Sequence, residues 1–164
     1  MTGAGLEVQP PQAAPTTAEH GGTVIVSSTT SDAHIWNLVF LQLLLEEIGF
    51  HVVNLGACVP DELLISSCRA QRPDLVVLSS VNGHGYQDGA STARRLRAEP
   101  GLIGLPMVIG GKLGISDTER EQHMDGLLAA GFDAVFDDRE GGSLAFRGYV
   151  AAVSRKREEA RELG

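Results

Sequence analysis

A carboxylate and an imidazole stand two residues apart in the sequence Asp32-Ala-His34. An imidazole nitrogen binds transition metals well, and a nearby carboxylate can accept a hydrogen bond from the other ring nitrogen and so fix the tautomer that binds. One histidine cannot hold a bare ion, but it suffices when a macrocycle fills the metal's other positions. Asp32 also suits the N-cap of a following helix, so an orienting role and a capping role both stay open.

Short apolar runs alternate with helical patterns from residue 23 onward. Strands are predicted at residues 23–28, 51–55, 74–80, 105–109 and 133–136, and helices at residues 35–48, from 59 onward, 90–98, 116–130 and 143–157. Five β-α units of this spacing predict an α/β fold, a doubly wound parallel sheet with helices on both faces. The first and third runs are almost purely apolar and should be central, which favours the flavodoxin-like, Rossmann-like strand order 2-1-3-4-5.

Three loops are expected to meet at one edge of this sheet. Ligands of doubly wound folds bind at the carboxyl ends of the strands, beside the switch point between the first and third strands. Residues 27–35, 79–86 and 110–116 follow the first, third and fourth strands, and they hold the most unusual residues of the chain. Their convergence predicts a binding site that includes Asp32 and His34.

Five consecutive hydroxyl residues, 27–31, give this site a second interpretation. A flavodoxin cradles a phosphate group with the loop at this position, although that loop also contains a glycine, which residues 27–31 lack. A phosphate site therefore stays open beside the metal-ligand site. Phospho-acceptor chemistry is excluded, because Ser28 and Ser79 occupy positions where a receiver domain needs acidic residues.

Composition and motifs exclude other classes. The 164 residues carry a net charge of −8 with 43% hydrophobic residues, which is typical of a folded acidic protein rather than a nucleic-acid binder. No apolar run has membrane length and no basic-then-apolar leader opens the chain, so we expect a cytoplasmic protein with no membrane and no nucleic-acid partner. Walker, dinucleotide-binding, nucleophile-elbow and His-Glu-x-x-His motifs are missing, and two cysteines alone build neither a disulfide framework nor a zinc site.

The chain divides into one domain and two tails. Residues 1–22 are rich in Pro, Gly, Ala, Thr and Gln, and are predicted to be a disordered tail because they offer almost no large apolar residue to bury. Residues 23–157 form the predicted domain, and residues 158–164 are expected to fray.

The loop motifs resemble a known family. Asp32-Ala-His34, Ser79-x-Val81 and Gly110-Gly111 are similar to the D-x-H…S-x-L…G-G signature of cobalamin-binding domains. Residues 49–56, with Val-Pro soon after, most resemble the small subunit of glutamate mutase, and the likeness spans roughly residues 23–153. The sequence departs from the pattern at Asn37, where D-x-H-x-x-G has glycine, and at Val81, where the signature has leucine.

The resemblance implies roles for these residues. His34 is the lower cobalt ligand with Asp32 behind it, Ser79 hydrogen-bonds the displaced base of the cofactor, and Gly110 and Gly111 leave room for its nucleotide tail. A side chain at Gly111 is therefore expected to block the cofactor while the fold survives. No catalytic residue beyond the cofactor is expected in this chain, and Lys112 meets either the cofactor or only solvent. The remaining expected contacts of the cofactor are Ser31, Ala33, Ile35, Ser80, Val81, Gly83, Leu113 and Gly114.

The implied function is that of the adenosylcobalamin-binding subunit of an isomerase that converts L-glutamate to 3-methylaspartate, inactive without a separate large catalytic subunit. The helix at 35–48 is apolar all round, so it either makes a thick core contact or presents Trp36, Phe40 and Leu43 to that partner. Alternatives are the small subunit of an acyl-CoA mutase, a non-enzymatic cobalamin carrier or sensor, and a methyl-transfer corrinoid protein, although those usually carry a helical cap.

Overall fold

A five-stranded parallel sheet forms the centre of the computed structural model, which describes residues 21–113, 116–137 and 141–163. The strand order is β2-β1-β3-β4-β5, which confirms the predicted doubly wound topology. The first and third strands are central, as their apolar sequences indicated. The strands are β1 (Thr23–Ser28), β2 (His51–Asn54), β3 (Leu75–Ser80), β4 (Met107–Gly111) and β5 (Ala134–Asp137).

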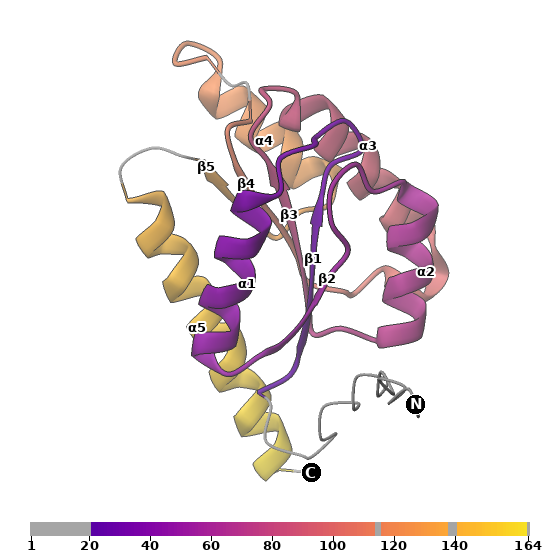
Figure 1. The fold of residues 1–164 in the computed structure, drawn as a ribbon, viewed down its shortest axis with the longest axis vertical. Coiled ribbons are helices and arrows are strands. Elements are labelled where there is room, and N and C mark those ends of the chain that lie inside the picture. The colour runs from indigo at the N-terminus through magenta and orange to yellow at the C-terminus, as the bar shows by residue number, and fades with distance from the viewer. Residues whose placement is uncertain (1–20, 114–115, 138–140, 164) are drawn as a thin grey trace, which may run out of the picture.

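Helices cover both faces of this sheet (Figure 1). On one face lie α1 (Trp36–Ile48) and α5 (Gly142–Glu162), and on the other lie α2 (Asp61–Gln71), α3 (Gly85–Ala98) and α4 (Arg120–Ala130). A 3₁₀ turn, η1 (Pro100–Leu102), leads into β4.

The core is divided by the sheet into two buried clusters, because successive strand residues point to opposite faces. Val24, Val26 and Val77 pack beneath α1 and α5, whereas Ile25 and Leu78 pack beneath the other three helices. The same alternation governs the polar ends of the strands. Neighbouring serines at the end of β3 are therefore expected to point to opposite faces.

Three helix boundaries differ from the predicted ones. α3 begins at Gly85, inside the stretch predicted to be a loop. α4 begins at Arg120, later than the predicted start at residue 116, and the Ser116 hydroxyl donates to a carboxylate oxygen of Glu119 at 3.3 Å instead of capping a backbone N–H. α5 continues to Glu162, beyond the predicted end of the last helix.

The structure describes only part of the two predicted tails. Residues 1–20 of the predicted N-terminal tail lie outside the described residues, while the backbone N–H of Gly21 donates to the Gly49 carbonyl at 2.6 Å. Among the helices that the structure describes, none combines the length and the apolar character needed to cross a membrane.

Candidate functional site

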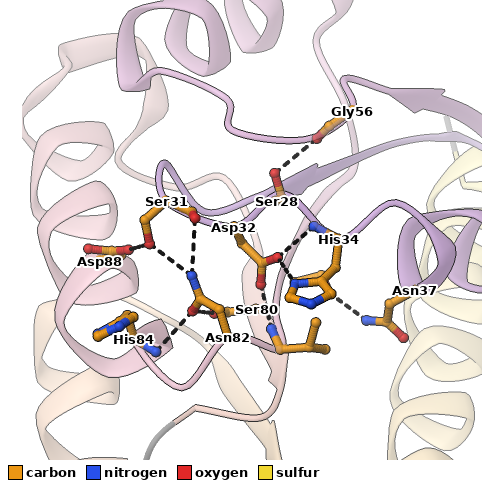
Figure 2. Close-up of polar contacts among 12 residues, drawn as sticks. Ser28, Ser31, Asp32, His34, Asn37, Gly56, Ser80, Asn82, His84 and Asp88 are labelled. Atoms are coloured by element: carbon orange, nitrogen blue, oxygen red, sulfur yellow. Dashed lines mark hydrogen bonds and ion pairs between the residues drawn. The ribbon is translucent and has the colours of Figure 1, made fainter.

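The Asp32 carboxylate is the centre of the site. Its Oδ1 accepts hydrogen bonds from the His34 backbone N–H at 2.9 Å and from His34 Nδ1 at 2.7 Å, and its Oδ2 accepts one from the Val81 backbone N–H at 2.5 Å (Figure 2). Asp32 is buried, whereas 60% of the His34 side chain is exposed. One carboxylate thus fixes the histidine and joins the loop after β1 to the loop after β3.

These contacts decide between the two roles left open for Asp32. Residue Ile35 occupies the N-cap of α1, and no side chain caps that helix. Both oxygens of Asp32 are directed to His34 and Val81 instead. Asp32 therefore orients the imidazole and does not cap the helix.

The electrostatics of Asp32 fix the histidine tautomer. Burial alone would raise the pKa of Asp32, but the hydrogen bonds from the Val81 and His34 backbone and from the His34 ring outweigh it and lower the pKa below its ordinary value. A carboxylate can only accept, so Nδ1 of His34 carries the proton. The lone pair of the neutral imidazole then lies on Nε2, on the exposed side of the ring, where it can bind a metal.

A bare metal ion finds no site here. Within residues 21–113, 116–137 and 141–163, no cluster of three or more His, Cys, Asp or Glu side chains could hold an ion. A metal at His34 would therefore need other ligands than the described His, Cys, Asp and Glu side chains.

Of the five consecutive hydroxyl residues, Ser27, Ser28 and Thr29 are buried, and residues 30 and 31 are exposed. Ser28 donates to the Gly56 carbonyl at 3.0 Å, and Ser31 donates to the Asp88 carboxylate. The Thr29 hydroxyl is buried without a hydrogen-bond partner. Two carboxylates, Asp32 and Asp88, lie within this network and would repel a phosphate. The arrangement disfavours the flavodoxin-like phosphate site.

An apolar cavity of about 240 Å³ opens between α1 and α5 at the same edge of the sheet. Its walls come from α1, from β3 and β4, from the end of β5, and from Gly141 and the start of α5. The lining residues are Asn37, Phe40, Leu41, Val77, Leu78, Val108, Ile109, Gly110, Gly111, Phe136, Asp137, Gly141, Gly142, Ser143 and Phe146. An engineered apolar cavity of about 150 Å³ accommodates benzene, so this one has room for a larger aromatic ring system.

Both glycines of the pair that ends β4 line this cavity, and both are also needed by the sheet. A Cβ at Gly110 would lie 2.9 Å from the Phe136 carbonyl oxygen on β5. Gly111 has φ +109°, and a Cβ there would collide with the Ser80 carbonyl oxygen on β3. The expectation that a side chain at Gly111 blocks the cofactor and spares the fold is wrong, because the collision is with backbone.

The other predicted contacts divide between the surface and the interior. Ser79 is buried and accepts a hydrogen bond from Asn37, whereas Ser80 contacts Asn82 on the opposite side of β3. Leu113 is also buried, in the core beneath α2, α3 and α4. Ala33, Ile35, Gly83 and Lys112 are exposed at the edge, and Gly114 lies outside the described residues.

Sequence reasoning missed the β5–α5 side of the site and the position of one arginine. Asp137, at the end of β5, lines the cavity and pairs with Arg120 at 2.8 Å. The three loops singled out in the sequence contain no arginine, but the first residue of α4 reaches this edge. The doubly wound topology itself was the available signal, because the carboxyl end of β5 and the start of α5 must come to the same edge.

Three comparisons relate this geometry to known proteins. The family model for the B12 binding domain matches residues 22–140. Glutamate mutase sigma subunit 2 of Haloarcula marismortui is 32% identical, over 84% of this chain and 93% of its own length. The glutamate mutase sigma subunit of Halobacterium salinarum is 33% identical, over 80% of this chain and 84% of its own. Among solved structures, a cobalamin-binding protein from Desulfitobacterium hafniense superposes with a TM-score of 0.60 at 22% identity, over 76% of this chain and 58% of its own; this shows the shared fold.

Proposed function

Because the chain belongs to the B12 binding domain family and to the glutamate mutase sigma subunits, we propose that it is the cobalamin-binding subunit of a glutamate mutase, a carbon-skeleton isomerase that converts L-glutamate to 3-methylaspartate. The names of the relatives favour this reaction over that of an acyl-CoA mutase and over a carrier or sensor role. No observation on the site favours either alternative.

The observation that carries the proposal is the oriented imidazole of His34. Its Nδ1 is held by Asp32, and Nε2 has no partner in the described part of the chain. Cobalamin brings a metal whose equatorial positions are filled by its macrocycle, so one protein nitrogen is what it needs. The residues present fit this group, and we assign His34 as the lower cobalt ligand.

The cavity between α1 and α5 supports the second half of the assignment. If His34 takes the lower position on cobalt, the cofactor's own base must be displaced, and its nucleotide tail needs a place to go. The cavity is largely apolar, is lined by the backbone of Gly110 and Gly111, and has room for an aromatic base. We assign the tail to this cavity.

In this assignment the chain's own residues bind the cofactor and hold its protein ligand, His34, in a fixed orientation. Asp32 keeps the proton on Nδ1 of His34, and the Val81 backbone N–H holds Asp32 in place. The adenosyl form of the cofactor, when bound, supplies the radical chemistry that a carbon-skeleton rearrangement requires. The substrate and its acid–base groups belong to a separate catalytic subunit, and this chain alone is inactive.

The exposed face of α1 is the surface we assign to that subunit. Trp36, Phe40 and Leu43 recur at helical spacing and are 86%, 52% and 62% exposed. Trp36 follows His34 by two residues, so the apolar strip continues directly from the cofactor site. A partner seated there would cover the site and exclude water from it.

Electron resonance of the cobalt(II) form tests the proposal. With the lower ligand supplied by the protein, the spectrum shows splitting by one axial nitrogen, and labelling the histidines with nitrogen-15 changes the triplet to a doublet. The control is His51→Ala, since His51 is exposed at the amino end of β2 and its loss leaves the splitting intact. A nitrogen splitting that stays the same after the histidines are labelled would falsify ligation by His34.

A further inference from the structure

Asn37 is a polar side chain in the wall of an apolar cavity, at a position where the cobalamin-binding motif has glycine. It lies in the first turn of α1, half-buried, and lines the cavity between α1 and α5. Its Nδ2 donates to the Ser79 hydroxyl oxygen at 2.5 Å. In Figure 2 Asn37 projects from the start of α1 with its amide nitrogen on the side of His34.

This contact changes what an incoming ligand meets. Ser79 is buried and does not line the cavity, whereas Asn37, which donates a hydrogen bond to Ser79, does line it. The carboxamide of Asn37 has two N–H donors, of which one is used on Ser79. The second N–H and the carbonyl Oδ1 have no hydrogen-bond partner among the described residues, and they belong to a side chain that faces the cavity.

The cavity does not require Asn37 to move before a ligand enters. Its volume of about 240 Å³ is present with the carboxamide already on Ser79. The two other polar side chains in the wall, Asp137 and Ser143, lie on the β5–α5 side. Asp137 is already paired with Arg120. On the side of α1 and β3, the free N–H of Asn37 is the hydrogen-bond donor that the wall offers.

We propose that Asn37 determines specificity for the nucleotide tail: one N–H holds Ser79, and the other donates to an unprotonated ring nitrogen of the displaced base. The inference rests on the proposed function and deepens it. In this chain the buried serine acts through the asparagine and does not itself contact the base. The site therefore prefers a cobamide whose base carries an acceptor nitrogen to one whose base has none.

Two cobamides and one isosteric substitution test this. Cobalamin carries a benzimidazole with an acceptor nitrogen, and cresolyl cobamide carries a phenolic ring without one; the corrin and phosphate are the same. Asn37→Asp keeps the size of the side chain but removes both donors. We expect it to lose about 3- to 10-fold more affinity for cobalamin than for cresolyl cobamide, the range of one net hydrogen bond.

Affinities are measured on the isolated chain by the change of the corrin spectrum on binding. The affinity of each ligand for the variant is compared with its affinity for the wild type, so the cost of displacing the base in free cobalamin cancels. Repulsion between the introduced carboxylate and the phosphate is common to both cobamides and cancels when their losses are compared. Circular dichroism checks that Asn37→Asp is folded. If Asn37→Asp does not fold, Asn37→Ala, which retains good helix propensity, is used in its place. In the wild-type chain, one side-chain amide proton of Asn37 should show the downfield shift of a new hydrogen bond with cobalamin and not with cresolyl cobamide.

Three results would overturn the proposal. Equal losses for the two cobamides would mean that Asn37 does not contact the ring nitrogen. A selective loss in Ser79→Ala but not in Asn37→Asp would make the serine hydroxyl the donor. Failure of the wild-type chain to bind either cobamide would overturn the proposed function and this inference with it, whereas the first two results leave the proposed function standing.

Discussion

At the scale of single residues, Asp32 acts on the cofactor site through His34. Asp32→Asn keeps the shape of the side chain but weakens its control of the imidazole, because an amide can present a donor where His34 Nδ1–H needs an acceptor. We expect cobalamin affinity to fall on the order of 10- to 100-fold, less than in His34→Ala, which removes the ligand itself. Titration of both variants by absorbance checks the order. An Asp32→Asn chain that binds as tightly as the wild type would leave Asp32 a structural role only.

Asp32 also makes the stability of the chain depend on pH. Three hydrogen bonds to its buried carboxylate lower its pKa in the folded state, so the folded state favours the ionised form more than the unfolded state does. This contribution is fully present above the unfolded pKa, near 3.8, and is lost as the pH falls through the lower folded pKa. The ionised carboxylate should make the wild type more stable than Asp32→Asn by ~1–3 kcal/mol at neutral pH.

Urea unfolding of the two proteins without cofactor measures this difference. The gap in the free energy of unfolding should narrow as the pH falls below the ordinary pKa of an aspartate. Acid-sensitive groups that do not contact residue 32 are common to both chains and cancel in the comparison. A gap that is the same at pH 7 and in strong acid would contradict the assigned hydrogen bonds.

Sequence reasoning predicted some of these residues and missed others for physical reasons. The spacing of Asp32 and His34 suffices to predict their contact, since residues two apart in a loop can meet. Whether Asp32 caps α1 or orients His34 depends on loop geometry, which spacing does not determine. The contact between Asn37 and Ser79 joins residues on different elements, and no local pattern indicates it.

At the scale of elements, the sheet itself requires the glycine pair at the end of β4, whether or not a ligand is bound. Gly111→Ala should lower the stability of the chain without cofactor, because the new Cβ meets the Ser80 carbonyl and the backbone has φ +109°. The matched control is Gly49→Ala, with φ +112° and open space around the new Cβ. Gly49→Ala should cost about 1 kcal/mol or slightly more, from strain alone, and Gly111→Ala clearly more.

Equilibrium unfolding in urea of both variants measures the difference. If the two substitutions cost the same, the collision at Gly111 is relieved by a small shift of β4, and the glycine pair is then free to serve the ligand alone. If Gly111→Ala costs more, loss of cobalamin binding in variants at this position reports on the fold and not on the cavity.

The topology was predictable because apolar periodicity and β-α spacing are properties of whole elements. Strands β1 and β3 are apolar on both faces, as central strands must be, and the order 2-1-3-4-5 followed from that. Helix ends were less predictable. The start of α3 at Gly85 could not be read from propensity, since Gly85 packs against Leu113 and Ser80, which are tertiary neighbours.

At the scale of the whole molecule, the sheet has two covered faces and one functional edge. The loops after β1 and β3, the end of β4 and the start of α5 lie at this edge (Figure 1). Helix α1 begins there and carries an exposed apolar strip. Of the two interpretations of that helix, the core contact is confirmed on one side, where Leu38, Leu44 and Leu45 are buried. On the other side Trp36, Phe40 and Leu43 are exposed, and the partner surface there stays a prediction.

We expect the chain alone to have no mutase activity, because the described residues at the functional edge offer few cationic groups that could hold the substrate. Glutamate carries two carboxylates, and a site for it needs guanidinium or ammonium groups that are free to pair with them. Arg120 reaches the functional edge, but its guanidinium is already paired with Asp137. Lys112 is exposed there and offers a single charge. We therefore expect a larger partner to supply the substrate site and to close the open edge against water.

Docking of that partner should depend on Trp36. Trp36→Glu places a charge in the middle of an apolar contact, next to the cofactor ligand, and should abolish both docking and turnover of glutamate to 3-methylaspartate in a mixture of this chain, coenzyme and a catalytic mutase subunit. Ile103→Glu is the matched control: Ile103 is 65% exposed, but it follows η1 at the amino end of β4, far from the functional edge, so the same charge there should leave both unchanged. Cofactor binding by Trp36→Glu, followed by absorbance, separates a docking defect from a loading defect. Turnover by the isolated chain, or docking that tolerates Trp36→Glu as well as Ile103→Glu, would mean that the α1 strip is not the surface through which the two subunits meet.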